Sequence, residues 1–176
     1  MPDQPSIREA RPEEFEPLGQ LLVEVYSALE GFPTPTEQPA YYDMLAHIGR
    51  FTERPGVQLL VALSPEGPLM GGVVYFSDMA QYGSGGTATA ERNAAGIRLL
   101  GVSPRYRGRG VGEALTRACL VRAEAQGLGQ VILHTTQAMQ VAWRMYERMG
   151  FRRSEDLDFL QGTLPVFGFR LPLTGP

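Results

Sequence analysis

A segment rich in arginine and glycine carries the residue types with the clearest chemistry in this chain. It leads from an apolar, strand-like stretch at residues 97–102 into a helix-like stretch that begins near residue 110. Glycine leaves backbone N–H groups uncovered and adopts conformations that other residues avoid. The first turn of a helix adds unpaired N–H groups and the positive end of the helix dipole. The segment therefore favours binding of a phosphate or pyrophosphate, and a glycine-rich turn with solvated arginines is the alternative. Its arginines and glycines are Arg105, Arg107, Gly108, Arg109, Gly110 and Gly112.

Two common phosphate-binding patterns do not match this segment. The P-loop requires a lysine, and all 16 basic residues of the chain are arginine. The dinucleotide fingerprint G-x-G-x-x-G requires a third glycine where Glu113 follows Gly108 and Gly110. That fingerprint also normally lies in the first strand–helix unit of its fold. The absence of lysine further excludes a Schiff-base mechanism.

The spacing Arg107-x-x-Gly110-x-Gly112 resembles the acetyl-CoA signature, Q/R-x-x-G-x-G/A, of the GNAT superfamily of N-acetyltransferases. The preceding stretch, residues 99–104, resembles the family's strand that ends in V-x-P. Further along, residues 142–151 resemble the family's helix A-x-x-L-Y-E-x-x-G-F. These motifs occur in the family's order and cover residues 97–151, and the helical start of the chain extends the resemblance to the remainder.

The resemblance implies an α/β (α+β) fold in which a central mixed, mostly antiparallel sheet is splayed at the cofactor site and flanked by helices on both faces. It implies acetyl-CoA (coenzyme A) as cosubstrate, with the pantetheine arm in the opening of the sheet and without a metal. By this resemblance the residues that hold the cofactor are Leu100, Gly101 and Val102 on the strand, Arg107, Gly108, Arg109, Gly110, Val111 and Gly112 around the pyrophosphate, and Met139 against the pantetheine.

The resemblance also assigns a catalytic role to Tyr146, which matches a family tyrosine near the thioester sulfur. Aminolysis of a thioester needs a neutral amine, a polarised carbonyl and a proton for the departing thiolate. Tyrosine has an ordinary pKa of about 10, so at neutral pH it is a donor and suits the role of general acid. A backbone N–H at a strand irregularity can stabilise the oxyanion. The alternative for Tyr146 is a core tyrosine in the apolar stripe of its helix.

Two positions depart from the family's pattern. Gly96 stands where members often carry a glutamate that helps to deprotonate the amine, so the general base is unassigned. Glu91 and Asp78 are candidates for it, and both could instead be solvated surface acids. Met139 stands where the family often has an asparagine that hydrogen-bonds the pantetheine; methionine can pack against the cofactor but cannot donate.

Composition narrows the class of protein. A chain of 176 residues is expected to form one domain, residues 1–176, with a sizeable core. A net charge of −3 argues against a nucleic-acid partner and favours cationic amines as acceptors. No apolar run is long enough to span a membrane, and the acidic first residues do not resemble a signal peptide, so we expect a cytoplasmic protein without a membrane partner. One cysteine, Cys119, excludes an internal disulfide and is expected to be a small buried apolar residue.

Hydrophobic spacing predicts the elements that position these residues. Apolar residues at helical spacing from Phe15 to Leu29 predict a first helix that begins at Pro12, and a second is expected from Pro39 to the Pro55–Gly56 stop, with Tyr41, Leu45 and Ile48 buried. Further helices are expected at 110–126 and 138–149, the latter closed by Gly150. Strands are expected at residues 6–10, 57–63, 69–76, 97–102, 131–133, 151–153 and 166–171.

Residues 77–96 show little apolar pattern, and a loop this long is usually functional or mobile. A lid over the acceptor and an insertion without a role are both open. His134 ends a predicted strand near the expected cleft, where it could line the substrate or serve the structure.

The leading functional hypothesis is an acetyl-CoA-dependent N-acetyltransferase that acts on a primary amine of a small molecule or protein, as a monomer or homodimer. The alternative is a non-catalytic acyl-CoA-binding or regulatory domain on the same fold. Thiol release from acetyl-CoA with a panel of amines distinguishes the two.

Overall fold

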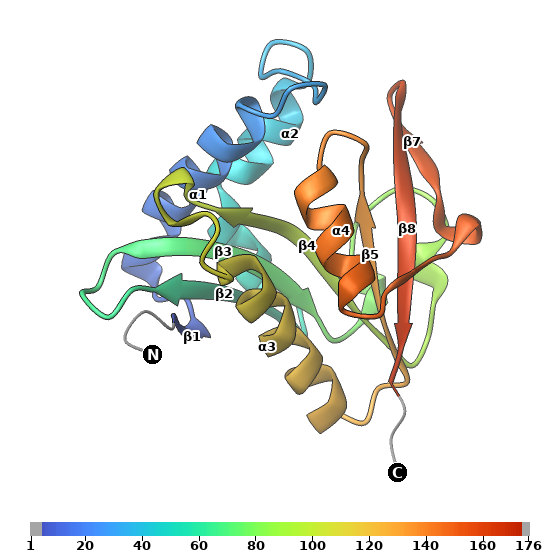
Figure 1. Ribbon diagram of the computed structural model, residues 1–176. Coiled ribbons are helices and arrows are strands. Elements are labelled where there is room, and N and C mark those ends of the chain that lie inside the picture. Colours follow the sequence, from blue (N-terminus) through green and yellow to red (C-terminus); the bar gives the residue numbers. More distant parts are fainter. Residues whose placement is uncertain (1–4, 174–176) are drawn as a thin grey trace.

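The computed structural model describes residues 5–173, which form a mixed sheet covered by helices (Figure 1). The strands follow the order β1-β2-β3-β4-β5-β8-β6, and β7 pairs with β8. All pairs are antiparallel except β4 with β5, which is parallel. The strands are β1 (Ser6–Glu9), β2 (Val57–Leu63), β3 (Leu69–Phe76), β4 (Ala94–Val102), β5 (Gln130–Thr135), β6 (Arg152–Arg153), β7 (Phe159–Gln161) and β8 (Leu164–Pro172).

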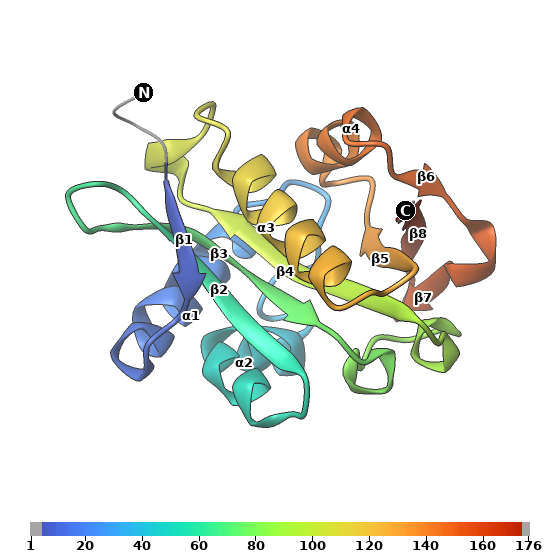
Figure 2. The same ribbon diagram turned by 90° about the horizontal axis from the view of Figure 1, so that it is seen from below.

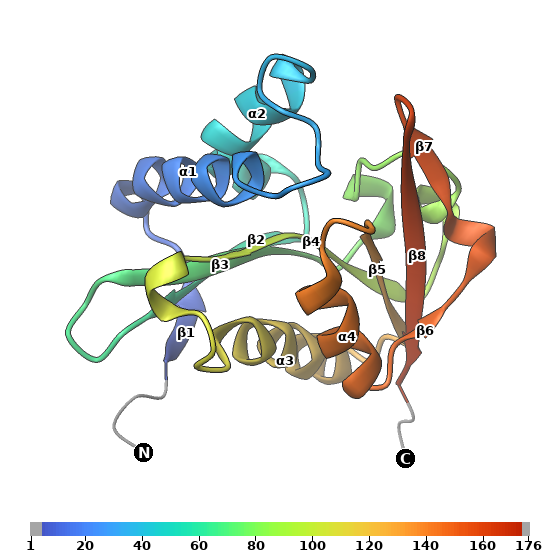
Figure 3. The ribbon, with the colours of Figure 1, turned by 45° about the horizontal axis from the view of Figure 1, so that its top comes forward.

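Helices cover both faces of this sheet (Figure 3). On one face lie α1 (Pro12–Ser27) and α2 (Pro39–Ala46), and on the other lie α3 (Val111–Ala125) and α4 (Gln140–Arg148). Two apolar cores result, one on each side of the sheet. Figure 2, seen from below, shows α3 lying along the sheet beside β4. The expected splayed mixed sheet with helices on both faces is confirmed.

Local signals explain how the first helix forms. Pro12 occupies its first turn, where the missing N–H costs nothing, and Glu14 accepts the backbone N–H of Arg11 at 2.8 Å. The same carboxylate pairs with Arg8, which lowers the pKa of Glu14 to about 2. Leu18 and Leu22 then bury their side chains completely against the sheet.

Most predicted elements are confirmed, with differences at their ends. The second predicted helix is divided into α2 and a 3₁₀ segment, Ile48–Glu53, and the more deeply buried tyrosine of α2 is Tyr42 rather than Tyr41. β4 begins at Ala94, so the long loop is shorter than expected and contains two 3₁₀ turns, Met79–Gln81 and Ala88–Ala90. The short strand β7 was not predicted, because its three residues carry no alternation. Within residues 5–173, no helix is long and apolar enough to cross a membrane.

Candidate active site

The parallel strands β4 and β5 separate along their length and open the sheet. They pair only from Ala94–Gln130 to Ile97–Leu133, and beyond these residues the two strands diverge (Figure 1). β4 continues to pair with β3, and β5 with β8. The backbone of β4 from Arg98 to Val102 therefore lines an opening in the centre of the sheet.

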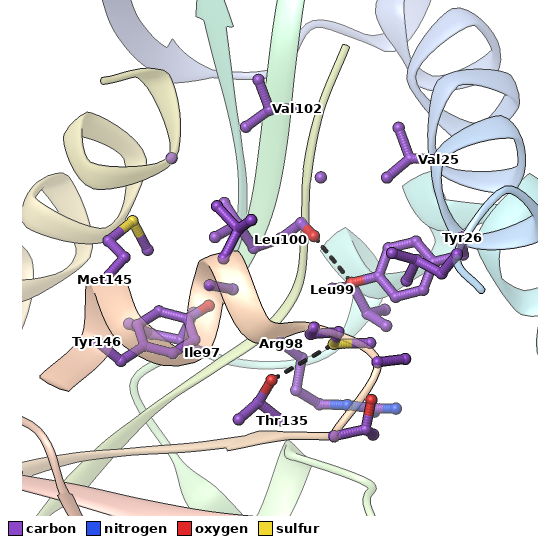
Figure 4. Close-up of a pocket in the computed structure, with 18 of the residues that line it drawn as sticks. Val25, Tyr26, Ile97, Arg98, Leu99, Leu100, Val102, Thr135, Met145 and Tyr146 are labelled. Atoms are coloured by element: carbon purple, nitrogen blue, oxygen red, sulfur yellow. Dashed lines mark hydrogen bonds between the residues drawn. The ribbon is translucent and has the colours of Figure 1, made fainter. Parts of the chain in front are cut away.

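A β-bulge interrupts β4 inside this opening. Val74 pairs with Arg98 and Gly72 with Gly101, so Leu99 and Leu100 together face a single residue of β3. Leu99 has a φ of 60°, which is rare for a side chain of this size and marks local strain. Because a bulge leaves an extra residue outside the ladder, it frees backbone groups of β4 to meet a ligand. The Leu100 carbonyl accepts a hydrogen bond from the Tyr26 hydroxyl at 2.9 Å (Figure 4).

The glycine at the end of β4 has a packing role. A Cβ atom on Gly101 would lie 2.5 Å from a methyl carbon of Leu22, so only glycine lets α1 approach β4 this closely. Gly72 on β3 is constrained in the same way by Leu18. The glycines thus seat α1 against the strand that lines the opening.

The arginine- and glycine-rich loop leads into the first turn of α3. Gly108 and Gly110 both have a φ of +76°, and neither would meet another atom within 4 Å if it carried a Cβ. Gly110 is the N-cap of α3, and the first intrahelical bond runs from the Ala114 N–H to the Gly110 carbonyl. The preceding N–H groups of the helix therefore have no intrahelical acceptor. With Arg107 exposed beside them, they fit an anionic group such as a pyrophosphate.

One cavity of about 690 Å³ connects this loop with the opening of the sheet. Its walls come from α1, α2, β4, the start of α3, the end of β5, α4 and the region around β7. Of the predicted cofactor residues it is lined by Leu100, Gly101, Val102, Arg107, Gly108, Gly110, Val111, Gly112 and Met139. Arg109 is not among the lining residues; its guanidinium lies over the Tyr106 ring, 5.5 Å from the centroid.

Tyr146 also lines the cavity, from α4. Figure 4 shows its hydroxyl directed towards the β4 side of the pocket. The ring packs edge-on against Phe151, with centroids 5.7 Å apart, and the side chain is almost fully buried. Burial raises the pKa of Tyr146 well above its ordinary value, so the hydroxyl keeps its proton at neutral pH. The position suits a proton donor, and the stripe of core residues beside it anchors the ring.

The end of the cavity away from the glycine loop is aromatic. Tyr26 of α1, Tyr41 of α2 and Phe32 between them form a cluster with ring centroids 5.6–6.1 Å apart. This wall was not predicted, although Tyr26 lies on the same buried stripe of α1 as Leu22. Burial raises the pKa of both tyrosines, so they are uncharged donors at neutral pH.

Tyr82 explains why residue 96 is glycine. A Cβ atom on Gly96 would lie 2.5 Å from the Tyr82 ring, so the ring fills the space of any side chain at this position. The Tyr82 hydroxyl lies 2.9 Å from His134 Nδ1, and His134 Nε2 lies 2.8 Å from the Leu157 carbonyl. Because a carbonyl can only accept, Nε2 carries the proton and Nδ1 accepts from Tyr82. Burial lowers the pKa of His134, which keeps the ring neutral.

The structure argues against both carboxylates suggested as general base. Glu91 pairs with Arg170 at 2.8 Å, next to the start of β4 and away from the opening. Asp78 accepts the Ala80 N–H as the cap of a 3₁₀ turn. Both line a separate small depression and neither lines the large cavity. Among the described lining residues the one carboxylate is Glu113, which pairs with Arg117 in α3.

The loop that was expected to be a lid or a mobile insertion is packed against the fold. Tyr82 is fully buried, the Thr87 hydroxyl donates to the Asp156 carbonyl, and Gly85 lies against the Phe159 ring. Tyr82 and Ser84 line the cavity. Cys119 is buried in the core under α3, where burial raises the pKa of its thiol to about 12, as expected for a packing residue.

Comparison with known proteins agrees with this geometry. A mycothiol acetyltransferase from Thermobispora bispora is 44% identical over 57 residues, which cover 32% of this chain and 19% of that protein. The chain thus spans about a fifth of the length of this curated relative. A GNAT acetyltransferase from Staphylococcus aureus superposes with a TM-score of 0.74 at 17% identity, covering 97% of this chain and 99% of that one. A phosphinothricin acetyltransferase from Sinorhizobium meliloti, solved in complex with AcCoA, gives a TM-score of 0.67 at 20% identity and covers 97% and 89%.

The profile of the Acetyltransferase (GNAT) family matches residues 22–151, about three quarters of the chain. The match includes the bulged strand, the glycine loop and the helix that carries Tyr146. This chain therefore belongs to the GNAT family of acetyltransferases.

Proposed function

We propose that this protein transfers the acetyl group of acetyl-CoA to a primary amine of a small molecule or protein by direct aminolysis, within one domain over residues 1–176. The observation that carries the proposal is a single cavity that connects the N-terminus of α3, the bulged strand β4 and Tyr146. Curated relatives named acetyltransferases, and a structural neighbour in complex with AcCoA, support acetyl-CoA as the cosubstrate.

The cofactor residues divide by chemistry. The glycine loop and the first turn of α3 hold the pyrophosphate through backbone N–H groups and Arg107. The β4 backbone from Leu100 to Val102, free on its β5 side, pairs with the amides of the pantetheine. Met139, whose sulfur lies 3.5 Å from the Thr135 hydroxyl, packs against the same arm without donating. The open glycine loop and the exposed Arg107 fit an anion, and we propose no metal for this site.

In the reaction the neutral amine nitrogen attacks the thioester carbonyl carbon and forms the new C–N bond. The carbonyl oxygen becomes an oxyanion, stabilised by a backbone N–H at the Leu99–Leu100 bulge. The C–S bond then breaks, the thiolate takes the Tyr146 proton, and the nitrogen releases its extra proton to water, from which Tyr146 is reprotonated. The products are the acetamide and free CoA. Much of the rate comes from holding the amine against the thioester.

Thiol release from acetyl-CoA, measured with a broad panel of primary amines, tests the proposal. The expected result is amine-dependent release of CoA with one acetamide formed per thiol. Tight acetyl-CoA binding without turnover across the panel would instead identify a non-catalytic acyl-CoA-binding domain.

A further inference from the structure

Arg98 lines the cavity with a charge that the described chain does not neutralise. None of the ion pairs within residues 5–173 includes it. Its Nη1 donates to the Tyr82 carbonyl at 2.8 Å, and its Nη2 contacts the Met44 sulfur at 3.9 Å. The guanidinium also lies 5.7 Å from the Phe51 ring centroid and 5.8 Å from that of Tyr82. Among residues 5–173, most of its N–H donors are therefore without an oxygen acceptor.

The surroundings make this arrangement costly unless a ligand completes it. Burial among aromatic rings lowers the pKa of Arg98, and the groups that oppose this shift are tyrosine hydroxyls rather than carboxylates. A guanidinium keeps its proton in proteins, so the charge persists. The Arg98 side chain is half-buried, and a partly desolvated cation without an anionic partner is unfavourable. The second cation near this point, Arg54, donates to the Gln81 carbonyl and adds positive potential.

A second polar group in the cavity also lacks a partner. Thr136, just after β5, is almost fully buried, and its hydroxyl makes no hydrogen bond to any described residue. It lines the same cavity as Arg98. Because the hydroxyl oxygen itself is shielded from solvent, Thr136 contributes its other atoms to the cavity wall and is not counted as a contact for the ligand.

The pyrophosphate of CoA cannot be the partner of Arg98. The glycine loop begins beyond Val102, and Arg98 lies four residues earlier on β4, roughly 13 Å along an extended strand. Figure 4 shows Val102 and Arg98 at opposite ends of the pocket, with the bulge at Leu99–Leu100 between them. An anion beside Arg98 would thus belong to the acceptor.

Resting on the proposed acetyl transfer, we infer that the acceptor is an amine that carries a carboxylate, and that Arg98 binds this carboxylate. The amine then faces the bulge, and the rest of the acceptor contacts the aromatic wall of Tyr26, Phe32 and Tyr41. The inference replaces the cationic acceptor suggested by the net charge of −3, because the local charge at the acceptor end is positive.

Matched acceptors test this inference on the wild-type protein. L-phenylalanine, its amide and phenethylamine share one amine and one ring but differ in the carboxylate. Acetylation is measured at several pH values and kcat/KM is expressed per neutral amine, which removes the effect of the different amine pKa values. We expect the carboxylate to raise kcat/KM by roughly 10- to 100-fold, the range of a charge-assisted hydrogen bond. Equal values for the acid and the amide would overturn the inference without any variant.

Two substitutions assign the effect to a residue. Arg98→Gln should abolish the preference for the acid and leave the affinity for CoA unchanged. Arg122→Gln, which removes an arginine of α3 that also donates to a backbone carbonyl but does not line the cavity, should retain the preference. A uniform loss with all three acceptors in Arg98→Gln would mean that Arg98 only supports the fold.

A binding measurement separates this inference from the proposed function. Titration of 3-phenylpropionate, which has no amine, into the CoA complex should show binding to the wild type and at least tenfold weaker binding to Arg98→Gln. Binding without acetylation of any amine would reject the proposed function and keep the anion site. Acetylation of amines without a preference for the acid, and without binding of 3-phenylpropionate, would reject the anion site and keep the function.

Discussion

Replacing Gly96 with alanine should displace Tyr82 and destabilise the fold. The new Cβ would lie 2.5 Å from Tyr82 Cδ1 and 2.7 Å from Met79 Sδ, and neither distance is tolerated by a methyl group. The Met79 side chain can rotate, whereas the Tyr82 ring is fully buried and bonded to His134. Overpacking of a core costs about 1–3 kcal/mol and a lost hydrogen bond about 1 kcal/mol more. We therefore expect the free energy of unfolding to fall by about 2–4 kcal/mol.

Urea denaturation of single and double variants measures this effect. Gly112→Ala is the matched control, because its Cβ would make an ordinary contact, 3.5 Å from Met145 Sδ, within a helix that alanine favours. In a Tyr82→Ala background the space beside residue 96 is open, so Gly96→Ala should cost at least about 1 kcal/mol less than in the wild type. An equal cost in both backgrounds would refute the claim that the Tyr82 ring excludes a side chain there.

Three further outcomes are expected. Gly110→Val should raise the calorimetric Kd for CoA at least tenfold, about 1.4 kcal/mol. Gly127→Val, with a similar positive φ (72° against 76°) and equally open surroundings at the other end of α3, should leave this Kd unchanged. Equal Kd values for the two variants would contradict the pyrophosphate site. Tyr146→Phe should lower kcat by about 10²–10⁴-fold while the Kd for CoA stays unchanged. Tyr75→Phe is the control and should retain kcat, because the Tyr75 hydroxyl donates to Gln126 outside the cavity. Full activity of Tyr146→Phe would mean that Tyr146 serves only in packing. Burial lowers the pKa of His134 below its ordinary value of 6.5, so the unfolded chain binds a proton before the folded chain does as the pH falls. The free energy of unfolding should therefore decrease below pH 6.5. Denaturation curves should show a weaker dependence of this free energy on pH for His134→Gln.

The parts of the site that follow one another in the sequence were predictable. The glycine loop and its helix are a local pattern, since a strand, a turn and a helix N-terminus lie within residues 97–112. Hydrophobic spacing also predicted α3 and α4, which cover one face of the sheet, and the hairpin of β2 and β3. These features depend on residues within a few positions of one another, which periodicity and turn chemistry describe directly.

The end of the cavity near Tyr82 and Arg98 was not predictable, because it depends on contacts between segments that are distant in the sequence. Tyr82 reaches the centre of the sheet from a loop without apolar pattern, and only the space above Gly96 shows why that loop is fixed. Arg98 lies in a segment predicted only as a strand, and only the folded chain shows that no carboxylate of residues 5–173 pairs with it. Glu91 was a candidate base for the same reason, since its partner Arg170 is far away in sequence.

The divergence of β4 and β5 has a consequence for the mechanics of the sheet. Four residue pairs between β4 and β5 join the part of the sheet that contains β1 to β4 to the part that contains β5, β6 and β8. A pantetheine arm bonded to the free edge of β4 would act as a surrogate strand and bridge the two parts. Cofactor binding should then slow amide hydrogen exchange in β4 and β5 far from any phosphate contact. It should also raise the melting temperature with cofactor concentration, since the ligand favours the folded chain by mass action.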